Sequence, residues 1–77
     1  MNKKLADIIT TVLRLKPKEV SENLSMDTCA TWDSLCHMEL IAEIERVFNI
    51  QLSFESIIKM RSVKGIIDVL NKKYGDQ

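Results

Sequence analysis

The sequence predicts an all-α domain built from three or four short helices. At 77 residues, the chain is long enough for one hydrophobic core and too short for two. It is 45% hydrophobic and 29% charged, with two glycines and one proline, a composition typical of folded helical proteins rather than disordered tails. Apolar residues recur every three or four positions in two separate segments, as they do on one face of a helix. We therefore expect residues 1–77 to form a single domain.

The first helix is predicted near the amino terminus. Its apolar face consists of Leu5, Ile8, Ile9, Val12 and Leu13. It should end before Pro17, because the residue that precedes a proline is disfavoured in helical conformation. From Lys18 to Asp33 no hydrophobic period is sustained, and polar side chains alternate with isolated apolar ones. We expect a long ordered loop pinned by these polar side chains, and a loop of this length in a small domain usually has a functional reason.

The longest predicted helix begins at Asp33 or Ser34, either of which is a good N-cap, and runs to about Phe48. It has two apolar faces. The wider face should meet the core and contains Leu40, Ile41, Ile44, Val47 and Phe48. The second lies on the side of Ser34 and contains Leu35, Met38 and Ala42, with Glu39 and Glu45 close by. Two explanations of the second face remain open: it packs against the loop or a short helix, or it is a docking strip with an acidic rim.

Two further helices are predicted in the last third of the chain. The stretch LSFESIIKM at 52–60 is long enough for one or two helical turns. Ser62 should then cap a final helix, whose apolar face contains Val63, Ile66, Ile67 and Leu70.

Charge is segregated along the chain although the formal net charge is zero. The window from Glu19 to Glu45 contains acidic residues and no lysine or arginine, and the eleven basic residues all lie outside it. An acidic middle repels phosphate backbones and attracts basic partners. We therefore expect no nucleic-acid ligand, and a DNA-binding domain would in addition need a basic recognition helix.

Ser34 is the residue whose position most needs an explanation. A serine at a helix start is most often a cap. A role as a hydrolase nucleophile is poorly supported, because WDSLC lacks the G-x-S-x-G turn and no third group is evident to orient His37. An enzyme is the least expected class. The helix N-terminus favours an anion, so a phosphodiester on the Ser34 oxygen would be well placed, although Asp33 opposes it.

The cysteines and the histidine do not form a recognisable metal or redox site. Cys29 and Cys36 are seven apart with no CxxC, and together with His37 they lack a fourth zinc ligand. Cys36 is expected to be inert and His37 to be a semi-buried core residue. Two free cysteines suit a reducing cytosol, and we expect a cytoplasmic protein with neither a signal peptide nor a membrane span.

The pattern around Ser34 resembles that of the acyl carrier protein family. The shared features are DSL at 33–35, the apolar and acidic helix that follows, its ending IERVFNIQL, and SFESIIKMRSVKGIIDVL, which looks like the family's third and fourth helices. The resemblance covers most of the chain. It implies a four-helix bundle of the acyl-carrier type, with a long loop between the first two helices and a short third helix.

The resemblance also implies a function. Ser34 aligns with the serine to which a phosphopantetheinyl transferase attaches 4'-phosphopantetheine from coenzyme A, using magnesium. The arm would hold an acyl group as a thioester, received from a loading ligase or transferase and passed to a synthase or transferase of a lipid or secondary-metabolite pathway. By alignment, the docking positions are Asp33, Leu35, Met38, Glu39, Ala42 and Glu45. Cys36, Arg46 and the zero net charge suggest a specialised member. Alternatives are an aminoacyl or peptidyl carrier and an unmodified helical interaction module.

Overall fold

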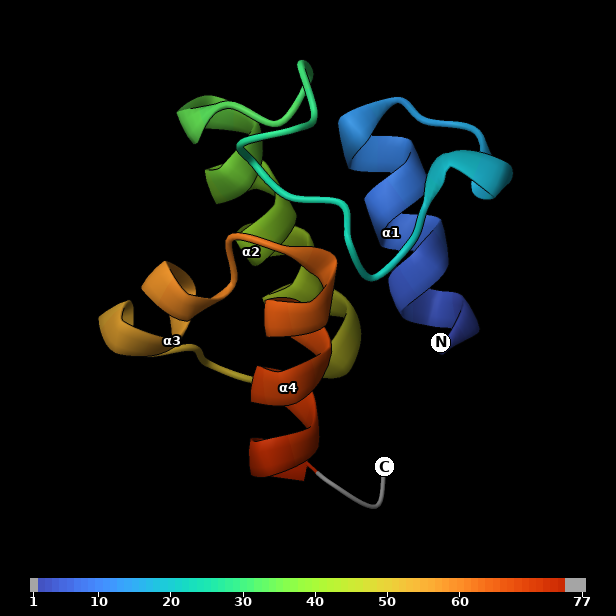
Figure 1. Cartoon of the computed structure of the whole chain (residues 1–77). Helices are drawn as coiled ribbons and strands as arrows, with labels where there is room; N and C mark the ends of the chain where they lie inside the picture. Colours follow the sequence, from blue (N-terminus) through green and yellow to red (C-terminus); the bar gives the residue numbers. More distant parts are fainter. Residues whose placement is uncertain (1, 75–77) are drawn as a thin grey trace.

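The computed structural model describes residues 2–74. These residues form the helices α1 (Lys3–Leu13), α2 (Ser34–Phe48), α3 (Phe54–Lys59) and α4 (Val63–Tyr74), with a 3-10 turn η1 (Pro17–Glu19) after the first helix. α1 and α3 lie on opposite sides of the molecule, and the long loop crosses between them in front of α2 (Figure 1). The predicted all-α bundle with a long first loop and a short third helix is confirmed.

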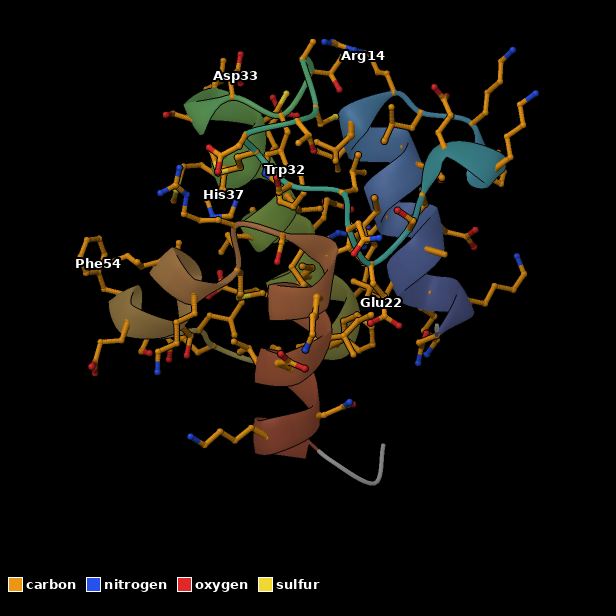
Figure 2. The ribbon with its side chains drawn as sticks, viewed as in Figure 1. Arg14, Glu22, Trp32, Asp33, His37 and Phe54 are labelled. Carbon is orange, nitrogen blue, oxygen red and sulfur yellow. The ribbon has the colours of Figure 1, made fainter. Side chains whose placement is uncertain are left out.

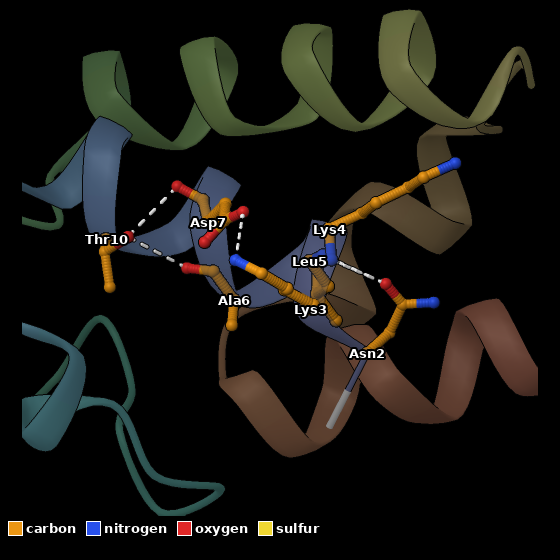
Figure 3. Close-up of polar contacts among 7 residues, drawn as sticks. All are labelled: Asn2, Lys3, Lys4, Leu5, Ala6, Asp7 and Thr10. Atoms are coloured by element: carbon orange, nitrogen blue, oxygen red, sulfur yellow. Dashed lines mark hydrogen bonds and ion pairs between the residues drawn. The ribbon is translucent and has the colours of Figure 1, made fainter.

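Side-chain and backbone caps set the limits of α1. The Asn2 side chain accepts hydrogen bonds from the backbone N–H groups of Lys4 at 2.7 Å and Leu5 at 3.4 Å, and Figure 3 shows it at the first turn. At the other end, Arg14 takes the left-handed conformation with φ 56°, and its N–H donates to the carbonyl of Thr10. α1 therefore ends at a left-handed residue, ahead of the proline.

Backbone hydrogen bonds hold the long loop against the junction between α3 and α4. The N–H of Met26 donates to the carbonyl of Arg61, and the N–H of Val63 donates to the carbonyl of Leu24, each at 2.9 Å. These bonds flank an isolated antiparallel bridge between Ser25 and Ser62. The loop is ordered as predicted, and backbone pairing contributes to that order in addition to polar side chains.

The core lies between α1, α2 and α4 and is closed by side chains of the loop. The predicted core face of α2 is confirmed, because Leu40, Ile41 and Ile44 are buried while Val47 and Phe48 pack against them half-buried. Trp32 enters the same core and is 2% exposed. The predicted cap of α4 is also confirmed, since the Ser62 hydroxyl accepts the N–H of Gly65 at 2.9 Å. Across residues 2–74, no helix is both long and apolar enough to cross a membrane.

Candidate functional site

Ser34 is the first residue of α2, and it does not cap the helix. The cap is Asp33, whose carboxylate accepts the backbone N–H of Cys36 at 2.9 Å. The Ser34 side chain is exposed, and within the described part of the chain its hydroxyl has no hydrogen-bond partner. Of the two predicted caps, Asp33 is therefore the correct one, and the interpretation of Ser34 as a cap is wrong.

Two other serines at helix starts, unlike Ser34, do cap their helices. The Ser53 hydroxyl accepts the N–H of Ser56 at 3.1 Å at the start of α3, and Ser62 plays the same part for α4. Both hydroxyls supply an acceptor to a backbone N–H that would otherwise lack one. Because Asp33 already fills this role on α2, the Ser34 oxygen is left free and accessible for chemistry.

A buried histidine supports the start of α2 from below. His37 is 8% exposed, as expected for a semi-buried residue, and it lies beside Trp32 (Figure 2). The Trp32 Nε1–H donates to His37 Nδ1 at 3.0 Å, and His37 Nε2 lies 3.1 Å from the carbonyl oxygen of Ile57. Since an indole nitrogen is only a donor, Nδ1 is the acceptor and Nε2 carries the proton given to Ile57. One ring thus ties the loop, α2 and α3 together.

The same two hydrogen bonds exclude a catalytic or metal-binding role for His37. Both ring nitrogens are engaged by Trp32 and Ile57, so neither is available to activate the Ser34 hydroxyl or to bind a metal ion. Among residues 2–74, no three His, Cys, Asp or Glu side chains are grouped closely enough to hold a metal. The sequence indicated a buried histidine but carried no local signal for its two partners, which lie five and twenty positions away.

Hydrogen bonding, burial and nearby charges shift the pKa values of two groups beside Ser34. The hydrogen bond from the Cys36 N–H, with a smaller contribution from the charge of Arg14, lowers the pKa of Asp33 below its usual 3.8. Burial, followed by the negative charges of Asp33 and Glu39, raises the pKa of the Cys36 thiol above its usual 9.0. Cys36 is therefore a neutral thiol near pH 7 and a poor nucleophile, in line with the inert role predicted for it.

The lowered pKa of Asp33 predicts a specific acid sensitivity. Because the folded state holds the carboxylate more strongly than the unfolded state, its stabilisation is complete above the unfolded pKa of about 4 and is lost as the pH falls through the lower folded pKa. Asp33→Asn keeps an N-capping side chain that does not titrate. Between pH 5 and pH 2.5, the thermal midpoint should fall further in the native protein than in this variant. Parallel pH curves for the two proteins would contradict the prediction.

Exposed apolar side chains follow Ser34 on α2, and others lie on α3. Leu35 is 72% exposed and Met38 is 54% exposed, and Ala42 and Glu39 are also exposed, so the explanation in which this face of α2 packs internally is wrong. We call the exposed side chains Leu35, Met38 and Ala42 of α2, together with Phe54 and Ile58 of α3, the apolar face. Figure 2 shows Phe54 projecting away from the bundle. The α3 members were missed in the sequence, although their spacing of four residues in an apolar stretch was a usable signal.

Glu45 differs from the other proposed docking residues. Its side chain is half-buried, and its carboxylate accepts the N–H of Leu52 at 2.9 Å. Glu45 therefore holds the connection between α2 and α3, whereas Glu39 and Asp33 are exposed beside the apolar face.

Four apolar side chains on and next to α2 and α3 differ in burial. Ile41 and Met60 are 2% and 0% exposed, while Met38 and Ile58 lie on the surface. A cavity of about 300 Å³ lies elsewhere, between the start of α1, the end of α2 and α4, and it is lined by Asn2, Leu5, Phe48, Asn49, Ile50, Ile67, Leu70 and Asn71. None of these four side chains lines that cavity.

Comparison with known proteins assigns the chain to a family. Residues 3–70 match the family model described as "Phosphopantetheine attachment site". The acyl carrier protein of Buchnera aphidicola subsp. Schizaphis graminum (strain Sg) is 36% identical over 73 residues, covering 95% of this chain and 92% of that protein. The chain belongs to the acyl carrier protein family. The acyl carrier protein of Amoebophilus asiaticus (strain 5a2) is also similar, at 35% identity over 79 residues, covering 100% of this chain and 96% of that protein.

Membership of the acyl carrier protein family settles the class of function. The domain is a carrier and not an enzyme, and its family implies a covalently attached 4'-phosphopantetheine. The family resemblance predicted from DSL and the surrounding helices is confirmed.

Proposed function

We propose that Ser34 bears the 4'-phosphopantetheine arm and that the domain carries an acyl intermediate on it between the enzymes of a lipid or secondary-metabolite pathway. The observation that supports the site is the free, exposed hydroxyl of Ser34 on the first residue of α2. A phosphodiester on this oxygen meets the positive end of the α2 dipole. The other two helix-start serines, Ser53 and Ser62, would lose a cap if their hydroxyls were esterified.

The chemistry required of the domain itself is small. The Ser34 oxygen is the nucleophile that attacks the pyrophosphate of coenzyme A in a magnesium-dependent phosphopantetheinyl transferase. A phosphorus–oxygen bond to Ser34 forms, the pyrophosphate bond breaks, 3',5'-adenosine diphosphate leaves, and a base of the transferase takes the hydroxyl proton. Once attached, the arm supplies a terminal thiol that can hold an acyl group as a thioester. The tether keeps that group at high effective concentration near successive enzymes.

Intact mass spectrometry tests the attachment site. The purified protein is incubated with coenzyme A, magnesium and a broad-specificity phosphopantetheinyl transferase, beside the variants Ser34→Ala and Ser53→Ala. We expect the native protein and Ser53→Ala to gain the mass of one arm and Ser34→Ala to gain none. A gain by Ser34→Ala, or no gain by the folded native protein, would refute the proposal, and the second result would favour the unmodified interaction module.

The apolar face is the surface we propose for partner enzymes. Its α2 members follow Ser34 on the same helix, its apolar members are exposed, and the acids Asp33 and Glu39 are exposed near the start of α2. Surfaces of this composition suit partners with an apolar patch bordered by basic residues. The proposed partners are the transferase, an enzyme that loads an acyl group and an enzyme that consumes it. Loading by a ligase that uses an amino acid would instead indicate an aminoacyl carrier.

Reversal of one charge should weaken this docking. Glu39→Lys removes an exposed carboxylate beside the apolar face without breaking a hydrogen bond recorded in residues 2–74. A rim charge is worth about 1 kcal/mol or less, so we expect arm transfer to slow by up to about fivefold at low salt and the difference to shrink at high salt. Asp68→Lys makes the same charge change on α4 and is the matched control. Equal rates for both variants at low salt would contradict the docking surface.

A further inference from the structure

Arg14 occupies a backbone position that is costly for its side chain. Its φ of 56° lies in the left-handed region, where glycine is the usual residue after a helix. Asn49, the other described non-glycine residue with positive φ, is a type that tolerates this conformation, whereas arginine has no such preference. Non-glycine residues in this conformation are stabilised by their surroundings and cluster at functional sites.

The tertiary structure brings Arg14 to the start of α2. The Thr31 hydroxyl donates to the carbonyl of Leu13 at 2.7 Å, which fastens the end of α1 to the segment just ahead of Asp33 and Ser34. Figure 2 shows the Arg14 side chain extending from the end of α1 toward the side on which Asp33 lies. The positive charge of Arg14 also contributes to the lowered pKa of Asp33, which agrees with this placement.

Arg14 is also distinguished from the other two arginines by its lack of a partner. Arg46 forms an ion pair with Glu43 at 2.8 Å, and Arg61 lies 3.7 Å from Asp27. Within residues 2–74, Arg14 takes part in no ion pair. Arg14 is exposed, so its guanidinium is available to bind an anion. It lies at the end of the molecule where α2 begins, and the start of α2 belongs to the acidic segment from Glu19 to Glu45.

We propose that the guanidinium of Arg14 binds the phosphodiester that joins the arm to Ser34, an inference that rests on the proposed attachment site. The modification adds a negative charge next to the Asp33 carboxylate, and these two charges repel each other. A guanidinium offers several N–H donors in a planar fork that matches phosphate oxygens and offsets this repulsion. Arg14 therefore holds the base of the arm, while the thiol end stays free to move.

A cycle of four proteins measures this interaction. The native protein and Arg14→Gln are each prepared with and without the arm, intact mass confirms the modification, and thermal midpoints are recorded at low salt. The difference between the two arm-induced shifts isolates the coupling of Arg14 to the modification from any effect of the substitution on the fold. We expect Arg14→Gln to make the arm-induced shift less favourable by about 2–4 °C. Near about 1 M salt the difference should largely disappear.

A control and a second signal make the result specific. Lys72→Gln removes a positive charge from α4, whose carboxyl end lies far from the start of α2 (Figure 1), and should leave the arm-induced shift unchanged. The ³¹P resonance of the phosphodiester should move in Arg14→Gln and stay in place in Lys72→Gln. Equal arm-induced shifts for native protein and Arg14→Gln, or an equal effect of Lys72→Gln, would overturn the inference. Failure of the native protein to gain the arm would instead refute the attachment site itself.

Discussion

Replacing Trp32 with alanine should lower the thermal midpoint by about 15 °C or more. Trp32 is 2% exposed, and truncation of a buried aromatic side chain to alanine costs about 3–5 kcal/mol. A domain of this size has a free energy of unfolding of roughly 4–12 kcal/mol, so the loss is a large fraction of the total. The change also removes the donor to His37 Nδ1 and leaves a buried acceptor without a partner. The loop ahead of Ser34 would lose its anchor.

Two other aromatic substitutions test this explanation. One separates the packing of Trp32 from its hydrogen bond, and the other is a control at an exposed position. Trp32→Phe keeps much of the packing but loses the N–H, so its cost should be intermediate. Phe54→Ala removes an aromatic ring that is 76% exposed and should change the free energy of unfolding by less than about 0.5 kcal/mol. Urea titration monitored by circular dichroism gives all three values. Similar losses for Trp32→Ala and Phe54→Ala would show that the loop anchor contributes little.

Gly65→Ala is expected to destabilise the domain by about 1–3 kcal/mol. From the sequence alone the opposite is predicted, because alanine stabilises a helix interior by up to about 1 kcal/mol relative to glycine. In the structure, a Cβ at residue 65 would collide with the carbonyl oxygen of Lys59 and would lie 3.2 Å from the Ser62 hydroxyl. The colliding atom belongs to the backbone at the end of α3. Relief of the clash must therefore move α3 away from α4.

The neighbouring position provides the control for this substitution. Lys64 is exposed on the same turn of α4, and within residues 2–74 its side chain forms only a surface ion pair, with Asp68 at 3.3 Å. Lys64→Ala should therefore change the free energy of unfolding by about 0.5 kcal/mol or less. The thermal midpoints of both variants, compared with that of the native protein, test the prediction. A midpoint for Gly65→Ala above that of the native protein would show that the close approach of α3 to α4 is not a constraint.

Local patterns determined the helices and the family of this protein. Helical spacing of apolar residues identified the core face of α2, and the serine ahead of α4 was recognised as its cap. The string DSL, together with the long loop before it and the helices around it, identified the acyl carrier family. The attachment of the arm to Ser34 stays a prediction. Helix faces and caps depend on residues within a few positions of one another, so they can be recognised without knowledge of the tertiary structure.

Contacts between distant parts of the chain decided the rest. The sequence left the cap of α2 open between Asp33 and Ser34, and it left the second face of α2 open between packing and exposure. It held no sign that His37 would bridge Trp32 and Ile57, or that Thr31 would fasten the end of α1 and bring Arg14 near the start of α2. Periodicity tells which side of a helix is apolar. Which neighbour covers that side, and which charge stands opposite it, is set only when the helices pack.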